Sequence, residues 1–279
     1  MDKVAIFYHD IFDFPLTKDD LVRWSCLAKL GPALPDRPRS RSARKVEVEN
    51  KSGFFFIKGK ADLISKRISR VKASQKKLRI AERASKILSF IPTVKMVAVT
   101  GSLAMMNSGK NSDIDLMIVT RKRMLWTTRL FVYLLIWLFG IGLRRPNNKQ
   151  EKDRLCINIW LDESDIAWSK PDRNLYTAHE IAQIVSLVNK DETYEKFLWK
   201  NKWILEFWPQ SVKIQKQEAG IRNHVSENPL FMVVEKLAFK IQYLYMKNKI
   251  SRETITPTRA LFHPHDWGKT VLTRLGLLD

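Results

Sequence analysis

Two short apolar runs in the middle of the chain most constrain what it can fold into. They are VKMVAVT, residues 94–100, and DIDLMIVT, residues 113–120. Short apolar runs of this kind, bounded by turn-forming or charged residues, are typical of buried strands. A further run, LCINIWL at residues 155–161, predicts a third strand. We therefore expect an α/β core built around these strands.

The segment that joins the first two runs carries the side chains with the clearest chemistry. Asp113 and Asp115 open the second strand, and because side chains alternate along a strand, both point to the same face. Two carboxylates this close repel each other and are stabilised by a divalent cation, usually the oxygen-seeking Mg²⁺. Gly101 allows a tight turn, Ser102 adds a hydroxyl donor, and the short helix expected next offers N-terminal amides to a phosphate.

The order of these elements is more specific than any one of them. A strand, Gly101-Ser102, ten intervening residues, Asp113-Ile114-Asp115 and an apolar strand together resemble the nucleotidyltransferase superfamily related to DNA polymerase beta. The resemblance implies a mixed sheet with helices on one face. It also implies that Gly101 and Ser102 contact the phosphates of a nucleoside triphosphate (NTP) and that Asp113 and Asp115 bind two Mg²⁺ ions. The implied reaction transfers a nucleoside monophosphate to a hydroxyl acceptor on a small molecule, a protein or an RNA, with loss of pyrophosphate.

The third strand departs from the pattern of that superfamily. Active members usually carry a third carboxylate there, as a metal ligand or general base, whereas this chain has Asn158 at the corresponding position. An amide offers a carbonyl oxygen to a metal but neither a charge nor a base. Asp153 and Asp162, at the two ends of the strand, are candidate substitutes. Two interpretations stay open: an active transferase, which we favour, and a catalytically degenerate protein of the same fold that binds nucleic acid or an anionic surface.

The remainder of the chain suggests further parts around this core. We expect a winged-helix-like module at 1–60, a basic helix or connector at 61–92, the nucleotidyltransferase core at 93–168 and a helical domain at 169–279. Within the first module, helices are expected before residue 30, a proline-rich loop at 31–45, and a hairpin around residues 50–53. In the last part, helices are expected at 176–189, 193–207, 229–248 and about 266–275. This layout, with the phrases DFPLT (13–17) and YTAHE (176–180), is similar to uncharacterised bacterial nucleotidyltransferase-domain proteins.

The charge of the chain is strongly positive and unevenly spread. Lys and Arg number 49 against 29 Asp and Glu, a formal net charge of +20. Cations are densest on the expected basic helix, where Glu82 is the one acid between Leu63 and Lys86 and the basic residues are Lys66, Arg67, Arg70, Lys72, Lys76, Lys77, Arg79, Arg83 and Lys86. Such a face attracts the phosphates of nucleic acid, nucleotide or lipid, or is a solvated helix surface.

An apolar stretch at residues 124–143 requires a separate interpretation. Arg129 interrupts it and leaves 14 uncharged residues, short of the roughly 20 that span a bilayer. We expect a buried helix of a globular domain, with an element at a membrane interface as the alternative. The acidic, weakly apolar N-terminus argues against a secretory signal, and two cysteines, Cys26 and Cys156, favour a reducing compartment. The expected location is cytoplasmic, with membrane association left open.

Overall fold

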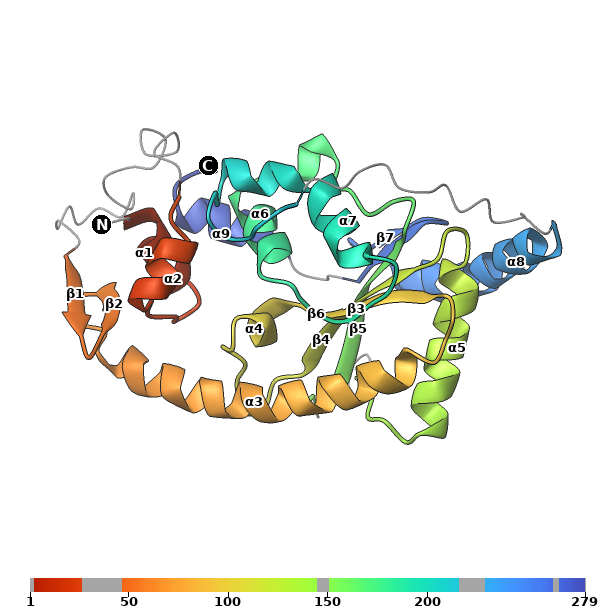
Figure 1. Ribbon diagram of the computed structural model, residues 1–279, viewed down its shortest axis with the longest axis horizontal. Helices are drawn as coiled ribbons and strands as arrows, with labels where there is room; N and C mark the ends of the chain where they lie inside the picture. The colour runs from red at the N-terminus through yellow and green to blue at the C-terminus, as the bar shows by residue number, and fades with distance from the viewer. Residues whose placement is uncertain (1–2, 27–46, 145–150, 216–228, 263–265, 279) are drawn as a thin grey trace.

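A mixed six-stranded sheet forms the centre of the molecule (Figure 1). The computed structural model describes residues 3–26, 47–144, 151–215, 229–262 and 266–278. The strand order is β6-β3-β4-β5-β8-β7, and within this sheet β4 and β5 are the parallel neighbours. The strands are β3 (Val94–Val99), β4 (Ile114–Thr120), β5 (Leu155–Asp162), β6 (Val185–Asn189), β7 (Thr254–Ile255) and β8 (Arg259–Leu261). The three strands predicted from the sequence are thus confirmed as adjacent strands of the sheet.

The helices surround this sheet, and a small hairpin lies at the N-terminal end of the molecule. The hairpin is β1 (Val48–Lys51) with β2 (Phe54–Ile57). The helices are α1 (Lys3–Asp10), α2 (Lys18–Arg23), α3 (Asp62–Leu88), α4 (Gly101–Ala104), α5 (Leu125–Leu138), α6 (Leu175–Ala182), α7 (Thr193–Lys200), α8 (Pro229–Met246) and α9 (Trp267–Arg274). The chain also forms short 3-10 helices at Lys170–Asp172, Lys202–Glu206 and Lys247–Lys249.

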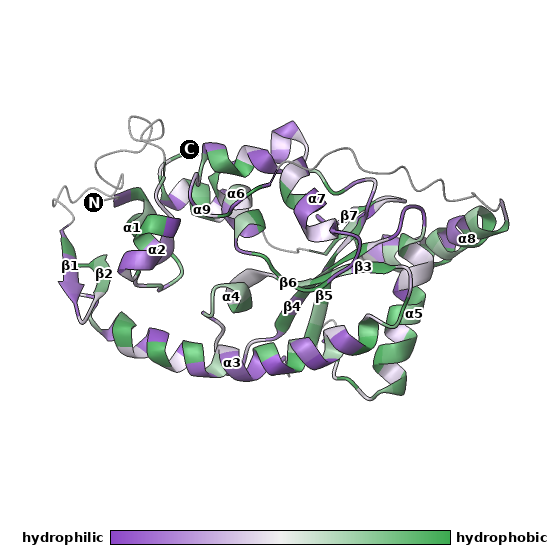
Figure 2. Cartoon of the chain, viewed as in Figure 1, coloured by the Kyte–Doolittle hydropathy of each residue, from purple (hydrophilic) through white to green (hydrophobic). Residues whose placement is uncertain are grey.

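Helices cover both faces of the sheet, so the expectation of helices on one face is wrong. Alternate residues of β4 divide between two cores: Leu116 and Ile118 pack with residues of α3 and α5, whereas Met117 and Val119 pack with residues of α6 and α7. The central strands are mostly hydrophobic (Figure 2), and their buried residues belong to cores on both faces. A sheet with two apolar faces requires a layer of helices on each.

The N-terminal elements form where local sequence signals place them. Thr17 caps α2 through a capping box, with its hydroxyl accepting from the Asp20 amide and the Asp20 carboxylate accepting from the Thr17 amide. The turn at Ser52-Gly53 closes the hairpin, and Leu16 bridges to Phe55. The proline-rich stretch 31–45 lies outside the described residues. The winged-helix-like character of this module, and the four-part division of the chain, stay predictions.

Two expectations for the second half of the chain are corrected. The helix expected over 176–189 ends at Ala182, and Val185–Asn189 instead pairs with β3 as an edge strand. The apolar helix expected to be buried is α5, but it is buried on one side only: Trp126 and Val132 are inside, while Trp137 is 76% exposed. The sheet contacts one side of a helix, and nothing in the described residues covers the opposite side of α5. None of the described helices has the length and apolarity needed to cross a membrane.

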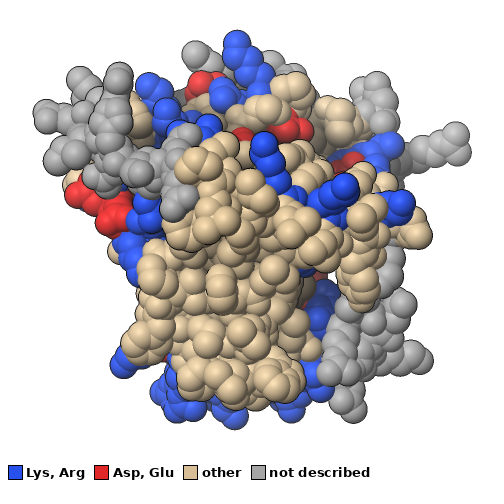
Figure 3. Space-filling model, turned by 90° about the vertical axis from the view of Figure 1, so that its right-hand side faces the viewer, with Lys and Arg blue, Asp and Glu red and all other residues tan. Residues whose placement is uncertain are grey.

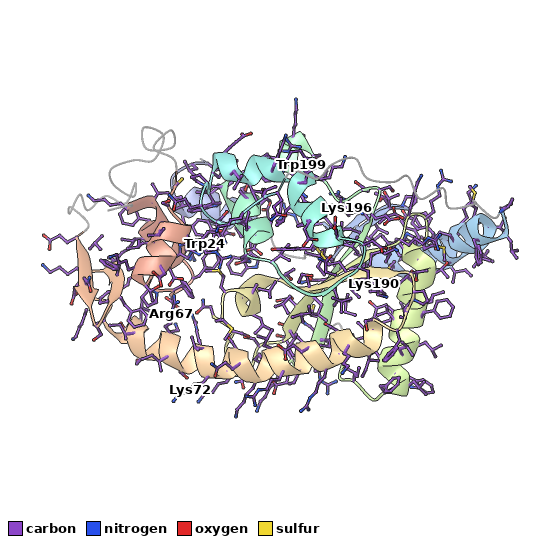
Figure 4. All side chains as sticks on the ribbon, viewed as in Figure 1. Trp24, Arg67, Lys72, Lys190, Lys196 and Trp199 are labelled. Atoms are coloured by element: carbon purple, nitrogen blue, oxygen red, sulfur yellow. The ribbon has the colours of Figure 1, made fainter. Side chains whose placement is uncertain are left out.

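If the basic side of α3 were only a solvated surface, all of its cations would face solvent, but some of them are buried against other elements. Arg67 donates to the Pro15 carbonyl at 2.7 Å and to the Asp20 carboxylate at 2.9 Å, and Arg70 donates to the Asn107 side chain at 3.0 Å. Arg67 accordingly lies between α3 and the N-terminal helices, whereas Lys72 points away from the molecule (Figure 4). One side of α3 therefore ties the N-terminal module to the core, and the other side is solvated.

Lys77 is the most deeply buried of these cations. Its side chain is 1% exposed, and Nζ donates to the Ser112 carbonyl and the Asp153 carboxylate, both at 2.6 Å. This bond fixes the segment just before Asp113 against the middle of α3. Burial of an ammonium group is tolerated only when it is paired in this way.

Replacing Lys77 with Gln is expected to lower the free energy of unfolding by about 1–3 kcal/mol, because the Ser112 carbonyl loses its charged donor. The matched control is Lys76→Gln on the same helix, whose exposed side chain should change stability by less than about 0.5 kcal/mol. Urea denaturation measures both. Equal, small effects of the two substitutions would contradict the packing described here.

Candidate functional site

Asp113 and Asp115 lie at the start of β4, on the face of the sheet that α6 covers. Asp115 has the same strand parity as Met117 and Val119, which belong to the core on that face. Ligand atoms of Asp113, Asp115 and Cys156 all lie within 4.8 Å of one another, a spacing that suits a single metal ion. The geometry therefore brings the two predicted aspartates together and adds a thiol beside them.

Gly101 packs directly against this carboxylate pair. Its φ is +58°, in the left-handed region, and a Cβ built on it would lie 2.9 Å from Asp115 Oδ2. Only glycine meets both conditions without strain. Ser102 follows on α4 and is exposed. Because α4 is a single turn of four residues, its dipole is weaker than that of a longer helix, and its N-terminus attracts a phosphate less strongly.

The ionised form of the Asp115 carboxyl group is electrostatically unfavourable. Burial, and then repulsion from Asp113, raises its pKa to about 7. The backbone amide of Thr100 donates to the Asp115 carbonyl at 3.1 Å, which fixes the strand but does not relieve the carboxylate. A cation placed between the two carboxylates would remove this penalty.

Arg144 partly compensates the charge of the pair. Its Nη1 donates to Asp113 Oδ2 at 2.8 Å, and its Nη2 pairs with Glu151 at 2.6 Å. The Arg144 side chain is 40% exposed, while that of Asp113 is 12% exposed. The guanidinium thus approaches the pair from the solvent side, where a charged ligand would also enter.

The parallel pairing of β4 with β5 brings the third-strand residues into the site. Cys156 is the register partner of Asp115, and Asn158 Nδ2 donates to Asp115 Oδ1 at 2.7 Å. Among the described residues Asn158 Oδ1 has no hydrogen-bond partner, although the atom is buried. Burial and the nearby aspartates raise the pKa of the Cys156 thiol to about 12.

The two acids considered as substitutes for a third carboxylate lie outside the site. Asp162 is at the far end of β5, where it pairs in register with Thr120 and accepts from the Arg123 amide. Asp153 precedes the strand but its carboxylate is paired with Lys77. Neither is positioned to act with Asp115.

A cavity of about 980 Å³ opens over the aspartate pair. It is lined by α1, the strand ends, α6, β8 and α9, so segments from both ends of the chain enclose it. Glu180 and Tyr176 of α6 line it together with Asp115. A volume of this size accommodates a nucleotide.

Glu180 is the acid that reasoning from the sequence missed. Burial, and then repulsion from Asp115, raises its pKa to about 8, while a hydrogen bond from Gln183 at 2.7 Å opposes the shift. The residue belongs to the phrase 176–180, singled out only for its resemblance to other proteins. No spacing rule could have placed it opposite the strands, because that depends on how α6 crosses the sheet.

Buried aromatic residues fix the cavity wall between the N-terminal helices and α6. His9 and His179 meet through their Nε2 atoms at 3.1 Å, and Trp24 stacks on His179 with ring centroids 4.0 Å apart. Burial lowers the pKa of both histidines, that of His9 to about 4. The cluster is therefore uncharged at neutral pH and serves as packing that holds α1 beside α6.

Gly101→Ala is expected to cost about 1–2 kcal/mol of stability for its left-handed backbone and about 1–3 kcal/mol more for the contact with Asp115. Gly140→Ala is the matched control, since Gly140 has φ +61° but no heavy atom within 4 Å of its would-be Cβ. Thermal unfolding separates the two contributions. Indistinguishable losses would show that Asp115 does not press on Gly101.

The raised pKa of Asp115 predicts a pH-dependent response to divalent cations. Between the unfolded value of about 4 and the folded value of about 7, the native state holds a proton that the unfolded chain has lost, so stability without metal falls as pH rises through this window. A bound cation removes the penalty. Mg²⁺ or Mn²⁺ should therefore raise Tm more at about pH 8 than at about pH 5.5.

Asp115→Asn should abolish this metal response, whereas Glu82→Gln, on the exposed side of α3, should retain it. A response of equal size at both pH values, or one that survives in Asp115→Asn, would place the cation elsewhere.

Comparison with known proteins agrees with this geometry. The nucleotidyltransferase domain family matches residues 81–207, which include β3 to β6 and the residues Gly101, Asp113, Asp115 and Asn158. No curated protein matches the chain. The matched segment, with its mixed α/β sheet, supports the nucleotidyltransferase superfamily expected from the sequence.

Proposed function

We propose that the protein transfers a nucleoside monophosphate from an NTP to a hydroxyl acceptor, using divalent cations held by Asp113 and Asp115. One observation carries the proposal: inside the matched domain, the Gly101 turn approaches the aspartate pair so closely that a Cβ would lie 2.9 Å from the carboxylate. This contact brings a turn suited to phosphates and a pair suited to cations to one wall of a nucleotide-sized cavity.

The residues at this wall fit the divalent metal that such domains typically use. Two adjacent carboxylates, destabilised by burial and mutual repulsion, are the donor set that Mg²⁺ and Mn²⁺ prefer. A bound cation neutralises phosphate charge and polarises the transferred group. Asp113 and Asp115 would be the shared ligands of the two expected ions, with Asn158 as a carbonyl donor beside them.

The remaining groups bind and orient the triphosphate. Gly101 and Ser102 line the cavity, and their backbone amides and the Ser102 hydroxyl would donate hydrogen bonds to phosphate oxygens. Arg144 neutralises Asp113 when no metal does so. With a cation bound to the Asp113 carboxylate, the Arg144 guanidinium would be free to bind the phosphates.

Glu180 supplies a base that the third strand lacks. In the proposed reaction the acceptor oxygen bonds to the α-phosphorus, the bond to the bridging oxygen breaks, and pyrophosphate leaves. The acceptor proton passes to a carboxylate, and Glu180, with its pKa raised to about 8, lines the same cavity as Asp115. A carboxyl group with a pKa near the working pH suits this role.

The alternative is a degenerate member of the fold that binds nucleotide or other polyanions without transfer. The part of β5 that lies beside Asp115 carries Cys156 and Asn158 in place of a third carboxylate, which favours this alternative. The two proposals agree on the cation site and differ on whether pyrophosphate is released.

Calorimetric titration of ATP, GTP, CTP and UTP with Mg²⁺ or Mn²⁺ tests the site, and pyrophosphate release across a panel of hydroxyl acceptors tests the reaction. We expect metal-dependent binding that weakens at least about tenfold in Asp113→Ala/Asp115→Ala, because the cations lose their ligands. Glu180→Gln should keep nucleotide binding and lower turnover by about 10²-fold or more.

Asp191→Asn, on the exposed loop after β6, is the control and should behave as the wild type. Binding without pyrophosphate release would favour the degenerate alternative. Binding that does not depend on metal, or that survives in the double aspartate variant, would contradict both proposals.

A further inference from the structure

Helix α5 exposes a continuous apolar side to solvent. Trp137 is 76% exposed, Leu134 is 53% exposed and Phe131 is 52% exposed, while the opposite side of the helix packs on the sheet. These side chains follow one another at three-residue spacing on one helix, so they form one strip. Scattered exposed apolar residues need no explanation, but a contiguous strip marks an interaction surface.

Helix α8 extends this strip into a broader surface. Val233, Leu237 and Ile241 are exposed at successive four-residue spacing, and Ile241 is 60% exposed. We call the exposed apolar side chains of α5 and α8 together the end face. It lies at the end of the molecule opposite the N-terminal hairpin (Figure 1).

Polar contacts fix the pairing of the two helices from the inside. The Glu235 carboxylate accepts from the amides of Trp126 and Thr127 at 2.7 and 2.9 Å, so α8 supplies the anionic cap of α5. Gln242 donates to the Trp126 carbonyl at 2.8 Å and accepts from Arg129 at 2.6 Å. Glu235 and Gln242 thus join the two helices from the inside, while the apolar side chains of the end face are left toward solvent.

The borders of the end face are cationic. Helix α8 exposes Lys236 and Lys240, and apart from the buried Glu235 neither α5 nor α8 contains an acid. Figure 3 shows a broad surface without charged side chains at this end of the molecule, with Lys and Arg along its lower edge and side chains of both charges above it. Helix α3, whose C-terminal half packs with α5, adds the exposed cations Arg83 and Lys86 at this end, whereas Lys72 lies toward the N-terminal module (Figure 4).

We propose that the end face docks on an anionic lipid surface, with the apolar side chains of α5 and α8 entering the interfacial layer and the cations of α8 and α3 contacting the headgroups. An apolar face bordered by Lys and Arg matches the two attractive contributions of such a membrane, apolar burial and charge. Trp137 and Tyr245, both exposed, are residue types enriched at that depth.

The end face has two other possible occupants, a second copy of the chain and an RNA, and its charges and apolar side chains suit neither. A second copy of the chain, paired about a twofold axis, would bring the lysines of α8 together, and Glu235, the one acid of α5 and α8, is buried. An RNA would satisfy the cations but leave the apolar side chains of the end face uncovered. The docking surface is separate from the nucleotide cavity and does not rest on the proposed transfer reaction.

Vesicle flotation of the full chain tests the proposal. The vesicles are phosphatidylcholine alone and phosphatidylcholine mixed with phosphatidylglycerol. We expect the wild type to float with the anionic vesicles and to bind them less as salt is raised. Leu134→Gln/Trp137→Gln/Leu237→Gln/Ile241→Gln should lower the fraction bound at least about tenfold, and Lys236→Gln/Lys240→Gln severalfold.

Matched control variants come from the opposite end of the molecule. Val22→Gln/Ile68→Gln removes equally exposed apolar residues, and Lys18→Gln/Lys51→Gln removes equally exposed cations; both should bind vesicles as the wild type does. Circular dichroism and the thermal unfolding midpoint establish that each variant folds.

Several results would overturn the proposal. These are a wild type that floats with neither vesicle type, an end-face variant that binds as the wild type, and controls that lose binding equally. A wild-type dimer that the end-face variant makes monomeric, without vesicle binding, would assign the face to a second copy. RNA binding that is retained by the end-face variant, lost on removal of the α3 cations and unaccompanied by vesicle binding would assign the cations to nucleic acid.

Discussion

Two carboxylates at the start of one strand repel each other in a partly buried place, and the surrounding structure is arranged about that repulsion. The pKa of Asp115 is raised to about 7 because its charge is poorly solvated and Asp113 is adjacent. Burying such a pair costs stability, and a bound cation would offset that cost. Arg144 partly satisfies Asp113, and Gly101 leaves room for Asp115. These contacts suit the cation and the phosphates of the proposed reaction.

More distant elements hold this pair in place. Lys77 of α3 bonds the carbonyl of Ser112, one residue before Asp113, and the parallel register of β4 and β5 sets Cys156 and Asn158 beside Asp115. The cations on the N-terminal half of α3 bind the loop between α1 and α2, so α1 can form a wall of the cavity. A helix whose composition suggests a polyanion-binding or a solvated surface therefore has a structural side as well.

The central strands and the closeness of Asp113 to Asp115 could be predicted from the sequence because both depend on local patterns. Alternation placed Asp113 and Asp115 on one face, and the glycine–serine turn marked where the first strand ends. Glu180 could not be predicted, since its approach to Asp115 depends on how α6 crosses the sheet. The sequence predicts helix rather than strand at Val185–Asn189, because five residues are too few for their periodicity to distinguish a strand from a continuation of the preceding helix. The exposed side of α5 was expected to be buried because apolarity alone does not state which side of a helix finds a partner.

The central claim is that the aspartate pair builds a site where cation and nucleotide bind together. Electron paramagnetic resonance of Mn²⁺, titrated with and without a non-hydrolysable NTP analogue, tests it most directly. Linkage requires that each ligand tighten the other by the same factor. We expect Mn²⁺ to bind more tightly when the analogue is present. In Asp115→Asn the analogue should no longer change the affinity for Mn²⁺. Mn²⁺ binding that is indifferent to the analogue, or equal coupling in Asp115→Asn, would contradict it.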